Sequence, residues 1–401
     1  MDSILLYLLI FSDYTIGKLC IADYALILLI VRACIKYPSI PLKKEYGVGI
    51  SLLLVGVSLS TVLNIGKEYF NLVSCILSVG KLMIYLFGIS VVPRYIISKG
   101  IDVGRIVKNA LIISVLGAFS QYAIVLVLGR GSWPLYGLGG NFFGLVSENS
   151  MFSYSGMMRP RGFWSEPAHY ALTISMLFIL VLFIEKNRTS KLIHITYILG
   201  MVMANSISGY GIMVAIYAIY LLNFKSANQF MATIFLGIIL MTGLIILIIS
   251  NDYLRSRLIG FMTLKDSSGV VRTIGGFHFL SEIPWYGVGV SNNANFYHSL
   301  NGLNSLWYSG SGEFYNNILL AIITMGYVGA VGFLLYEYGV LRKNKKIFFA
   351  LLVTHFGWGK LFTAPIWIFL IYYLIMEGQA TEKNQKHPKK HMSVAVCRGS
   401  S

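Results

Sequence analysis

Four ionisable side chains lie within eleven residues of the sequence, where a polar stretch gives way to an apolar one. The four are Arg159, Arg161, Glu166 and His169. Glu166 and His169 are three residues apart, so in the first turn of a helix they would share one face. Ser165 is the expected N-cap, and Pro167 suits the first turn because its missing N–H has no intrahelical acceptor there. Two arginines before a helix N-terminus predict a phosphate-binding site.

A simpler interpretation of these residues stays open. Arg159 and Arg161 would then anchor the chain at a membrane interface, and Glu166 would only favour the helix dipole. The chain has 16 acidic residues in 401, so charge is scarce. Its concentration at one boundary therefore favours a functional site.

A second long polar stretch, at about 251–313, holds further candidates. It holds Arg255, Arg257, Lys265, Arg272, Glu282 and His298. Asn, Tyr and Trp are frequent at 285–289 and 292–298, and they suit carbohydrate because amides bond hydroxyls and rings stack on flat C–H faces. Glu313, Asn316 and Asn317 lie at the start of the next apolar run, where helix capping is the alternative to glycan binding. For His298 the alternative is a surface residue of a flexible loop.

Three other ionisable residues are weaker candidates. Lys81 lies inside an apolar run with no obvious partner, and a lysine whose amine reaches the interface explains it as well as a buried charge. His355 and Lys360 flank a Gly-rich turn at 356–359, which we expect at the outer surface.

The sequence lacks the motifs of several common enzyme classes. It has no G-x-x-x-x-G-K-[ST], H-E-x-x-H, G-x-S-x-G or D-x-D sequence of the relevant kind, and its four cysteines form no C-x-x-C pair. We therefore expect no metal and no cofactor, and no use of ATP or of a cytoplasmic sugar nucleotide.

The composition excludes an ordinary soluble domain. Hydrophobic residues make up 56% of the chain and charged residues only 12%, with a mean hydropathy of +0.70. We predict an all-α, polytopic transmembrane bundle of about ten to twelve spans in one membrane domain, residues 1–376, with long outer loops at about 129–165 and 251–313 and a basic, disordered cytoplasmic tail at 377–401. The predicted apolar runs are roughly 4–31 (one run or two short pieces), 46–64, 69–92, 107–128, 166–184, 192–206, 208–223, 228–250, 314–338, 347–359 and 361–376.

The basic residues predict the orientation of the chain. About two thirds of the 32 Lys and Arg residues fall on every second short loop or in the tail, which the positive-inside rule makes cytoplasmic. Both long polar loops are then outside. The net charge of +16 arises mostly from basic residues scattered among the loops between spans, so nucleic-acid binding is not expected.

Three short windows carry a family resemblance. The run from Arg159 to Ala171 resembles the R-P-x-G-x-x-x-E-P-x-H-x-A signature of bacterial Wzy-type O-antigen and capsule polymerases. Arg272 followed by residues 283–289 looks like the family's R…P-x-x-G-x-G segment, and residues 315–320 with 325–329 are similar to its H/x-N-x-x-L…G-x-x-G entry into a helix. Related O-antigen ligases carry a His before that Asn, where this chain has Tyr315 or Asn316, so it departs from the ligase pattern.

The resemblance implies a GT-C-like bundle that joins oligosaccharide repeats carried on undecaprenyl pyrophosphate, at the periplasmic face of a bacterial inner membrane. Its partners would be those lipid-linked substrates and membrane lipid, and whether a chain-length regulator binds stays open. Arg159 and Arg272 would hold the pyrophosphate, with Arg161 secondary, and either Glu166 or His169 would be the general base.

Two other functions are alternatives. An O-antigen ligase would transfer the finished glycan to lipid A core with the same donor. A polysaccharide flippase or transporter would place ionisable residues in broken helices near the middle of the membrane, whereas here they are predicted in outer loops.

Overall fold

The computed structural model of the chain describes residues 1–16, 19–37, 44–128, 160–164, 166–185, 190–222, 279–300, 316–357 and 361–386, with isolated positions between 242 and 263. Twelve α-helices lie in these described ranges, with one two-stranded hairpin and two 3-10 turns. The all-α prediction is confirmed to that extent.

The elements follow one another along the chain as α1 (Asp2–Leu8), β1 (Thr15–Ile16), β2 (Leu19–Cys20), α2 (Ile21–Lys36), η1 (Lys44–Tyr46), α3 (Gly47–Val62), α4 (Leu72–Ser98), α5 (Val103–Leu128), α7 (Pro167–Ile184), α8 (Lys191–Ala204), α9 (Ile207–Leu221), η6 (Phe279–Ser281), α14 (Asn293–Ser299), α15 (Asn317–Leu341), α16 (Lys345–His355) and α17 (Ala364–Lys386).

Four described helices, α4, α5, α7 and α15, are long and apolar enough to cross a membrane. Three shorter apolar helices, α3, α8 and α9, pack among them. The chain is therefore a multi-pass membrane protein by the length and composition of its helices. The predicted run at 4–31 is two pieces, α1 and α2, because the hairpin interrupts it. The predicted run at 228–250 lies outside the described ranges, apart from two isolated positions.

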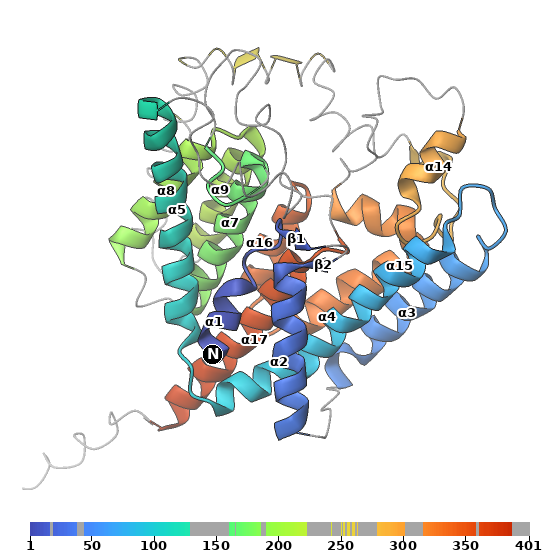
Figure 1. The fold of residues 1–401 in the computed structure, drawn as a ribbon, viewed down its shortest axis with the longest axis horizontal. Coiled ribbons are helices and arrows are strands. Elements are labelled where there is room, and N and C mark those ends of the chain that lie inside the picture. Colours follow the sequence, from blue (N-terminus) through green and yellow to red (C-terminus); the bar gives the residue numbers. More distant parts are fainter. Residues whose placement is uncertain are drawn as a thin grey trace, which may run out of the picture.

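Helix α7 lies at the centre of one half of the bundle. It packs against α5, α8, α9, α16 and α17, and 83% of its apolar window is buried (Figure 1). Since it is apolar on all sides, it suits an interior position. The Glu166–His169 segment thus lies at the first turn of the most enclosed span.

Helix α15 is broken at Gly326, whereas the sequence suggested one continuous run over 314–338. Gly326 has φ +69° and ψ −178°, and a Cβ there would lie 2.5 Å from the carbonyl oxygen of Trp285. The loop residues fill the break: Val288 and Gly289 donate backbone N–H bonds to Ile323 and Thr324, at 2.8 and 3.2 Å. Only glycine allows this close approach, so the chain can turn between the two limbs, 317–325 and 327–341.

The second limb of α15 packs on α3 through glycines. A Cβ on Gly56 would lie 2.3 Å from the Cα of Gly329, and one on Gly332 would lie 2.2 Å from the backbone nitrogen of Leu53. Small residues at such crossings let two membrane helices approach closely. The tight α3–α15 contact therefore requires them.

We expect Gly56→Ala to destabilise the protein by about 1–3 kcal/mol, because the two helices must separate to admit the methyl group. Gly80→Ala in α4 is the matched control, since nothing lies within 4 Å of its Cβ position. Thermal unfolding of the purified protein in detergent measures both. Equal unfolding temperatures for the two variants would contradict the close crossing.

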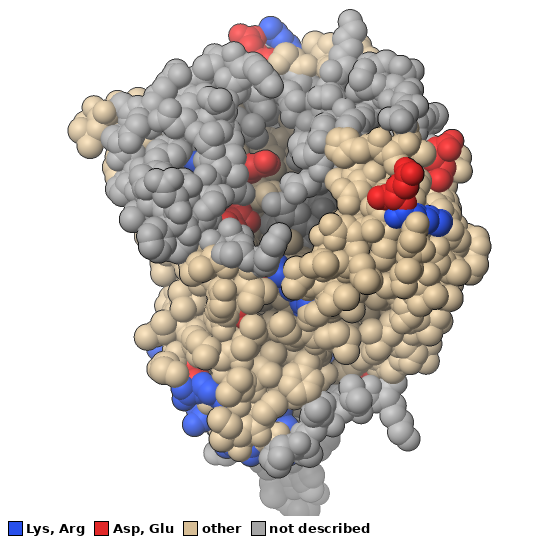
Figure 2. Space-filling model, turned by 45° about the vertical axis from the view of Figure 1, so that its right-hand side comes forward, with Lys and Arg blue, Asp and Glu red and all other residues tan. Residues whose placement is uncertain are grey.

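Basic residues gather at one end of the bundle, here called the basic end. Arg32 pairs with Asp2 at 2.9 Å, Lys108 pairs with Glu185, and Lys343 lies 3.3 Å from Glu377. On the face shown in Figure 2, Lys and Arg collect towards the lower end, below a broad uncharged surface. Helix α17 continues through the first ten residues of the predicted tail, to Lys386. Gln379 donates to the carbonyl of Ile101 there, so this part of the chain is helical rather than disordered.

Candidate functional site

The segment 160–164 lies against α5 at the end of the bundle opposite the basic end. Arg161 is buried, with 3% of its surface exposed. The backbone N–H groups of Arg161 and Gly162 both donate to Oε1 of Gln121 in α5, each at 2.8 Å. Gly162 has φ +58°, a conformation that favours glycine. A buried glutamine and a glycine turn thus fix the backbone that carries Arg161.

Helix α7 begins one residue later than predicted. Its N-cap is Glu166, which is extended at φ −140° and ψ 151°, and Pro167 takes the first helical position. The prediction of Ser165 as N-cap is therefore wrong, and Ser165 itself lies outside the described residues. Glu166 makes no side-chain capping bond, because its carboxylate is longer than the Ser or Asp that reach back to the helix N–H groups.

His169 is paired with an acid that the sequence analysis did not single out. Its Nδ1 lies 3.0 Å from Oδ2 of Asp13, which follows α1, and both side chains are largely buried. Thr173 donates its hydroxyl to the carbonyl of His169, one turn along α7, at 2.9 Å. The imidazole is thereby held by a carboxylate at one ring nitrogen, which sets its orientation.

Tyr14 completes this group of side chains. Burial and the neighbouring Asp13 raise the pKa of Tyr14, while Arg161 lowers it, and the net direction is upward. The phenol therefore stays protonated and can donate a hydrogen bond. We call Asp13, Tyr14, Gln121, Arg161 and His169, together with Glu166 at the N-cap of α7, the α1–α7 site.

An apolar crevice lies beside this site. Its polar lining residues are Ser12, next to Asp13 in the chain, and Thr173, whose hydroxyl bonds the carbonyl of His169. Apolar side chains of α7, of α17 and of the residues that follow α1 form the rest. Those side chains are Leu9, Ile10, Met176, Leu177, Leu180, Pro365, Ile368, Phe369 and Tyr372.

The other predicted site residues do not all join this cluster. Arg159, Arg272 and Glu313 lie outside the described residues. His298 is exposed at the end of α14. Asn316 is the N-cap of α15, and its Oδ1 accepts the N–H of Leu319 at 2.8 Å, so the capping interpretation is confirmed for it.

Asn317 belongs to a second, fully buried group. Its Nδ2 lies 3.2 Å from Nδ1 of His355, whose Nε2 lies 2.8 Å from Oε2 of Glu337. His355 is buried, so its predicted place at the outer surface is wrong. The break in α15 explains the contact, because it folds residue 317 back towards the limb that carries Glu337. Oε1 of Glu337 and Oδ1 of Asn317 have no partner in the described part of the chain.

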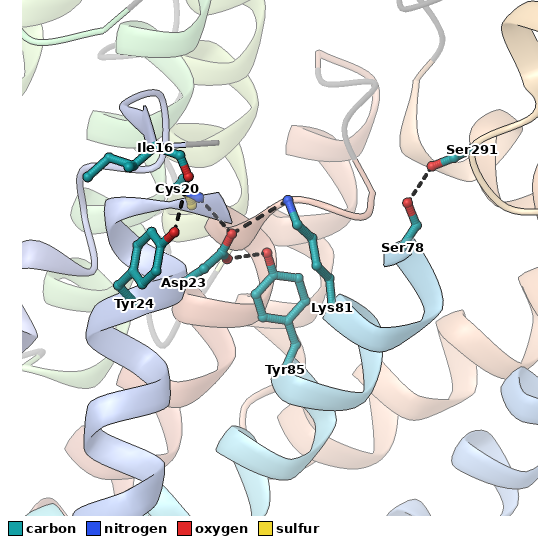
Figure 3. A network of polar contacts seen from close by, with 8 residues as sticks. All are labelled: Ile16, Cys20, Asp23, Tyr24, Ser78, Lys81, Tyr85 and Ser291. Carbon is teal, nitrogen blue, oxygen red and sulfur yellow. Dashed lines mark hydrogen bonds and ion pairs between the residues drawn. The ribbon is translucent and has the colours of Figure 1, made fainter. Parts of the chain in front are cut away.

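A third polar group surrounds Asp23 in the first turn of α2 (Figure 3). The backbone N–H of Cys20 donates to Oδ2 at 2.9 Å, and Oη of Tyr85 donates to Oδ1 at 2.6 Å. Nζ of Lys81 lies 3.6 Å from Oδ2. The sequence offered no partner for Lys81, because Asp23 lies in a distant apolar run.

Comparison with known proteins gives no relative: no family model, curated protein or solved structure matches this chain. Among the described residues, no group of three or more His, Cys, Asp or Glu side chains is placed to hold a metal ion. The interpretation of function therefore depends on the geometry of the sites and on the sequence resemblance.

Proposed function

We propose that this protein is a polymerase that joins oligosaccharide repeat units carried on undecaprenyl pyrophosphate. The observation that supports it is the group formed by the buried Arg161, by Tyr14, whose pKa Arg161 lowers, and by the His169–Asp13 pair, next to an apolar crevice. A guanidinium pairs with phosphate oxygens through two parallel bonds. By the positive-inside rule the basic end is cytoplasmic, and the α1–α7 site faces the periplasm of a bacterial inner membrane. The bundle would be GT-C-like.

His169 is the better general base of the two that the sequence left open. With its proton on Nδ1, facing Asp13, Nε2 is the basic nitrogen that would take the proton of an acceptor hydroxyl. The hydroxyl oxygen attacks the anomeric carbon of the donor sugar, and its proton passes to Nε2. The bond from that carbon to the pyrophosphate oxygen breaks, and Arg161 stabilises the charge that grows on the leaving group. The donor is already activated, so this step needs neither metal nor nucleotide.

Substitution of the two candidate bases distinguishes their roles. We expect His169→Ala to lower polymerisation by about 10²–10⁴-fold, and Asp13→Asn to lower it less, because the imidazole loses only its orienting partner. Glu166→Gln is expected to retain most of the activity. The measurement is the length distribution of surface polysaccharide on a gel, in a strain that lacks the gene, with membrane levels matched by blot. A normal ladder with His169→Ala and only single repeats with Glu166→Gln would reverse the assignment.

A transporter or flippase is the second candidate, because the structure contains a broken helix beside a buried His–Glu pair. In such proteins the free ends of the broken helix bind the substrate or ion. Here Val288 and Gly289 donate to the carbonyls of Ile323 and Thr324, so the loop already occupies part of the break. The same gel separates the candidates, since loss of a flippase removes every repeat from the surface, whereas loss of a polymerase leaves single repeats. Loss of attachment to lipid A core while lipid-linked polymer accumulates would indicate a ligase.

A further inference from the structure

Lys81 is a membrane-embedded cation that faces a single carboxylate in the described part of the chain. It lies in α4, one of the four candidate spans, and 23% of its side chain is exposed. Its one described ionic partner is Asp23, and 3.6 Å is too long for a good hydrogen bond. Asp23 already accepts shorter bonds from Cys20 and Tyr85. The ammonium group has three donors, so it keeps capacity for an anionic ligand.

This cation lies near the α1–α7 site through a shared hairpin. The N–H of Ile21 donates to the carbonyl of Tyr14 at 2.8 Å, so the base of the β1–β2 hairpin is closed. Asp13 directly precedes this base, and Asp23 lies two residues after it. The hairpin lies near the middle of the molecule, between α2 and the helices around α7 (Figure 1). The His169–Asp13 pair and the Lys81–Asp23 pair therefore flank one short element.

Lys81 shares one face of α4 with Ser78 and Tyr85. Ser78, one turn earlier on that face, lies 2.5 Å from the hydroxyl of Ser291, in the loop that fills the break of α15. Tyr85, one turn later, bonds Asp23 (Figure 3). Lys81 thus lies between the Ser78–Ser291 contact and the buried carboxylate of Asp23, and part of its side chain is exposed.

We propose that Lys81 binds the phosphate of a second lipid-linked substrate, and that Asp23 neutralises it when this site is empty. The inference rests on the proposed function, because a polymerase that joins two lipid-linked units must hold two anionic head groups side by side. Arg161 would hold one and Lys81 the other. A compact ammonium in a site of low polarity binds phosphate as a point charge, and an intramembrane charge of this kind is costly unless it is used.

Two substitutions separate this role from a structural ion pair. Polyprenyl pyrophosphate is titrated into the purified full-length protein in lipid nanodiscs, and the number of sites and Kd are measured. Lys81→Met is expected to reduce the sites from two to one. Asp23→Asn keeps the shape and the Cys20 contact but frees the ammonium, so we expect binding at that site to be at least about tenfold tighter. A purely structural pair predicts instead that both variants lose stability and leave the number of sites unchanged.

Lys108→Met is the matched control, because Lys108 pairs with Glu185 at the basic end and 27% of its side chain is exposed. It should keep two sites. If Lys81→Met does not fold, Lys81→Gln carries the same expectation. Inorganic pyrophosphate is titrated in parallel, and Kd values no weaker than those of the lipid would overturn a lipid-linked ligand. Two sites in the Lys81 variant, or weaker binding in Asp23→Asn, would overturn the proposal for Lys81 alone. No binding to the wild-type protein would instead overturn the proposed function.

Discussion

Cells that carry Arg161→Met are expected to display single repeat units and no polymer. Arg161 is buried and close enough to Tyr14 to lower its pKa, so water screens its charge little, and its loss would remove the main group that we propose stabilises the leaving pyrophosphate. Removal of one such group lowers turnover by about 10²–10³-fold in enzymes that stabilise a developing anion. The measurement is the polysaccharide ladder, with membrane levels compared by blot.

Arg161→Lys and Arg342→Met are the controls for this variant. Arg161→Lys keeps the charge without the two-pronged geometry, so we expect short ladders rather than none. Arg342 pairs with Glu45 at the basic end, and its loss should leave a normal ladder. A full-length ladder from Arg161→Met at normal membrane level would remove Arg161 from the site.

The second large effect is expected in stability. Glu337→Ala leaves His355 buried without its carboxylate, and removal of one partner from a buried pair costs about 3–5 kcal/mol. Glu337→Gln retains an acceptor for the imidazole and should cost less. Thermal unfolding in detergent measures both variants.

The same two variants test what the buried pair does. If Glu337→Gln is stable and still makes polymer, the pair holds the two limbs of α15 together. Unchanged stability in Glu337→Ala would contradict that role. A stable Glu337→Gln variant that exports no repeats would favour the transporter candidate.

The sequence predicted the features that depend on local chemistry. The helix that follows the Glu166–Pro167 junction could be predicted, because proline favours the first helical turn and the apolar run behind it is long. The basic end could also be predicted, since Lys and Arg remain where spans meet water. Both predictions depend only on residues that are close together in the sequence.

Features that depend on distant contacts could not be predicted in the same way. Asp13 and Asp23 stood inside a predicted apolar run, and only the fold pairs them with His169 and Lys81. Two acids in one membrane run were the available signal, because buried charges require partners. Gly326 gave no local sign of a break, since a glycine within an apolar helix is common and its positive φ depends on the loop at 285–289.

Polymer formation by the purified protein tests the central claim most directly. Lipid-linked single repeats are extracted from the strain that lacks the gene and are mixed with the purified chain in liposomes. We predict that the wild-type protein converts them into a ladder of longer lipid-linked chains without added nucleotide or metal, and that the His169→Ala and Arg161→Met proteins do not. Repeats that remain single with active, folded wild-type protein, or equal ladders from all three proteins, would contradict the account.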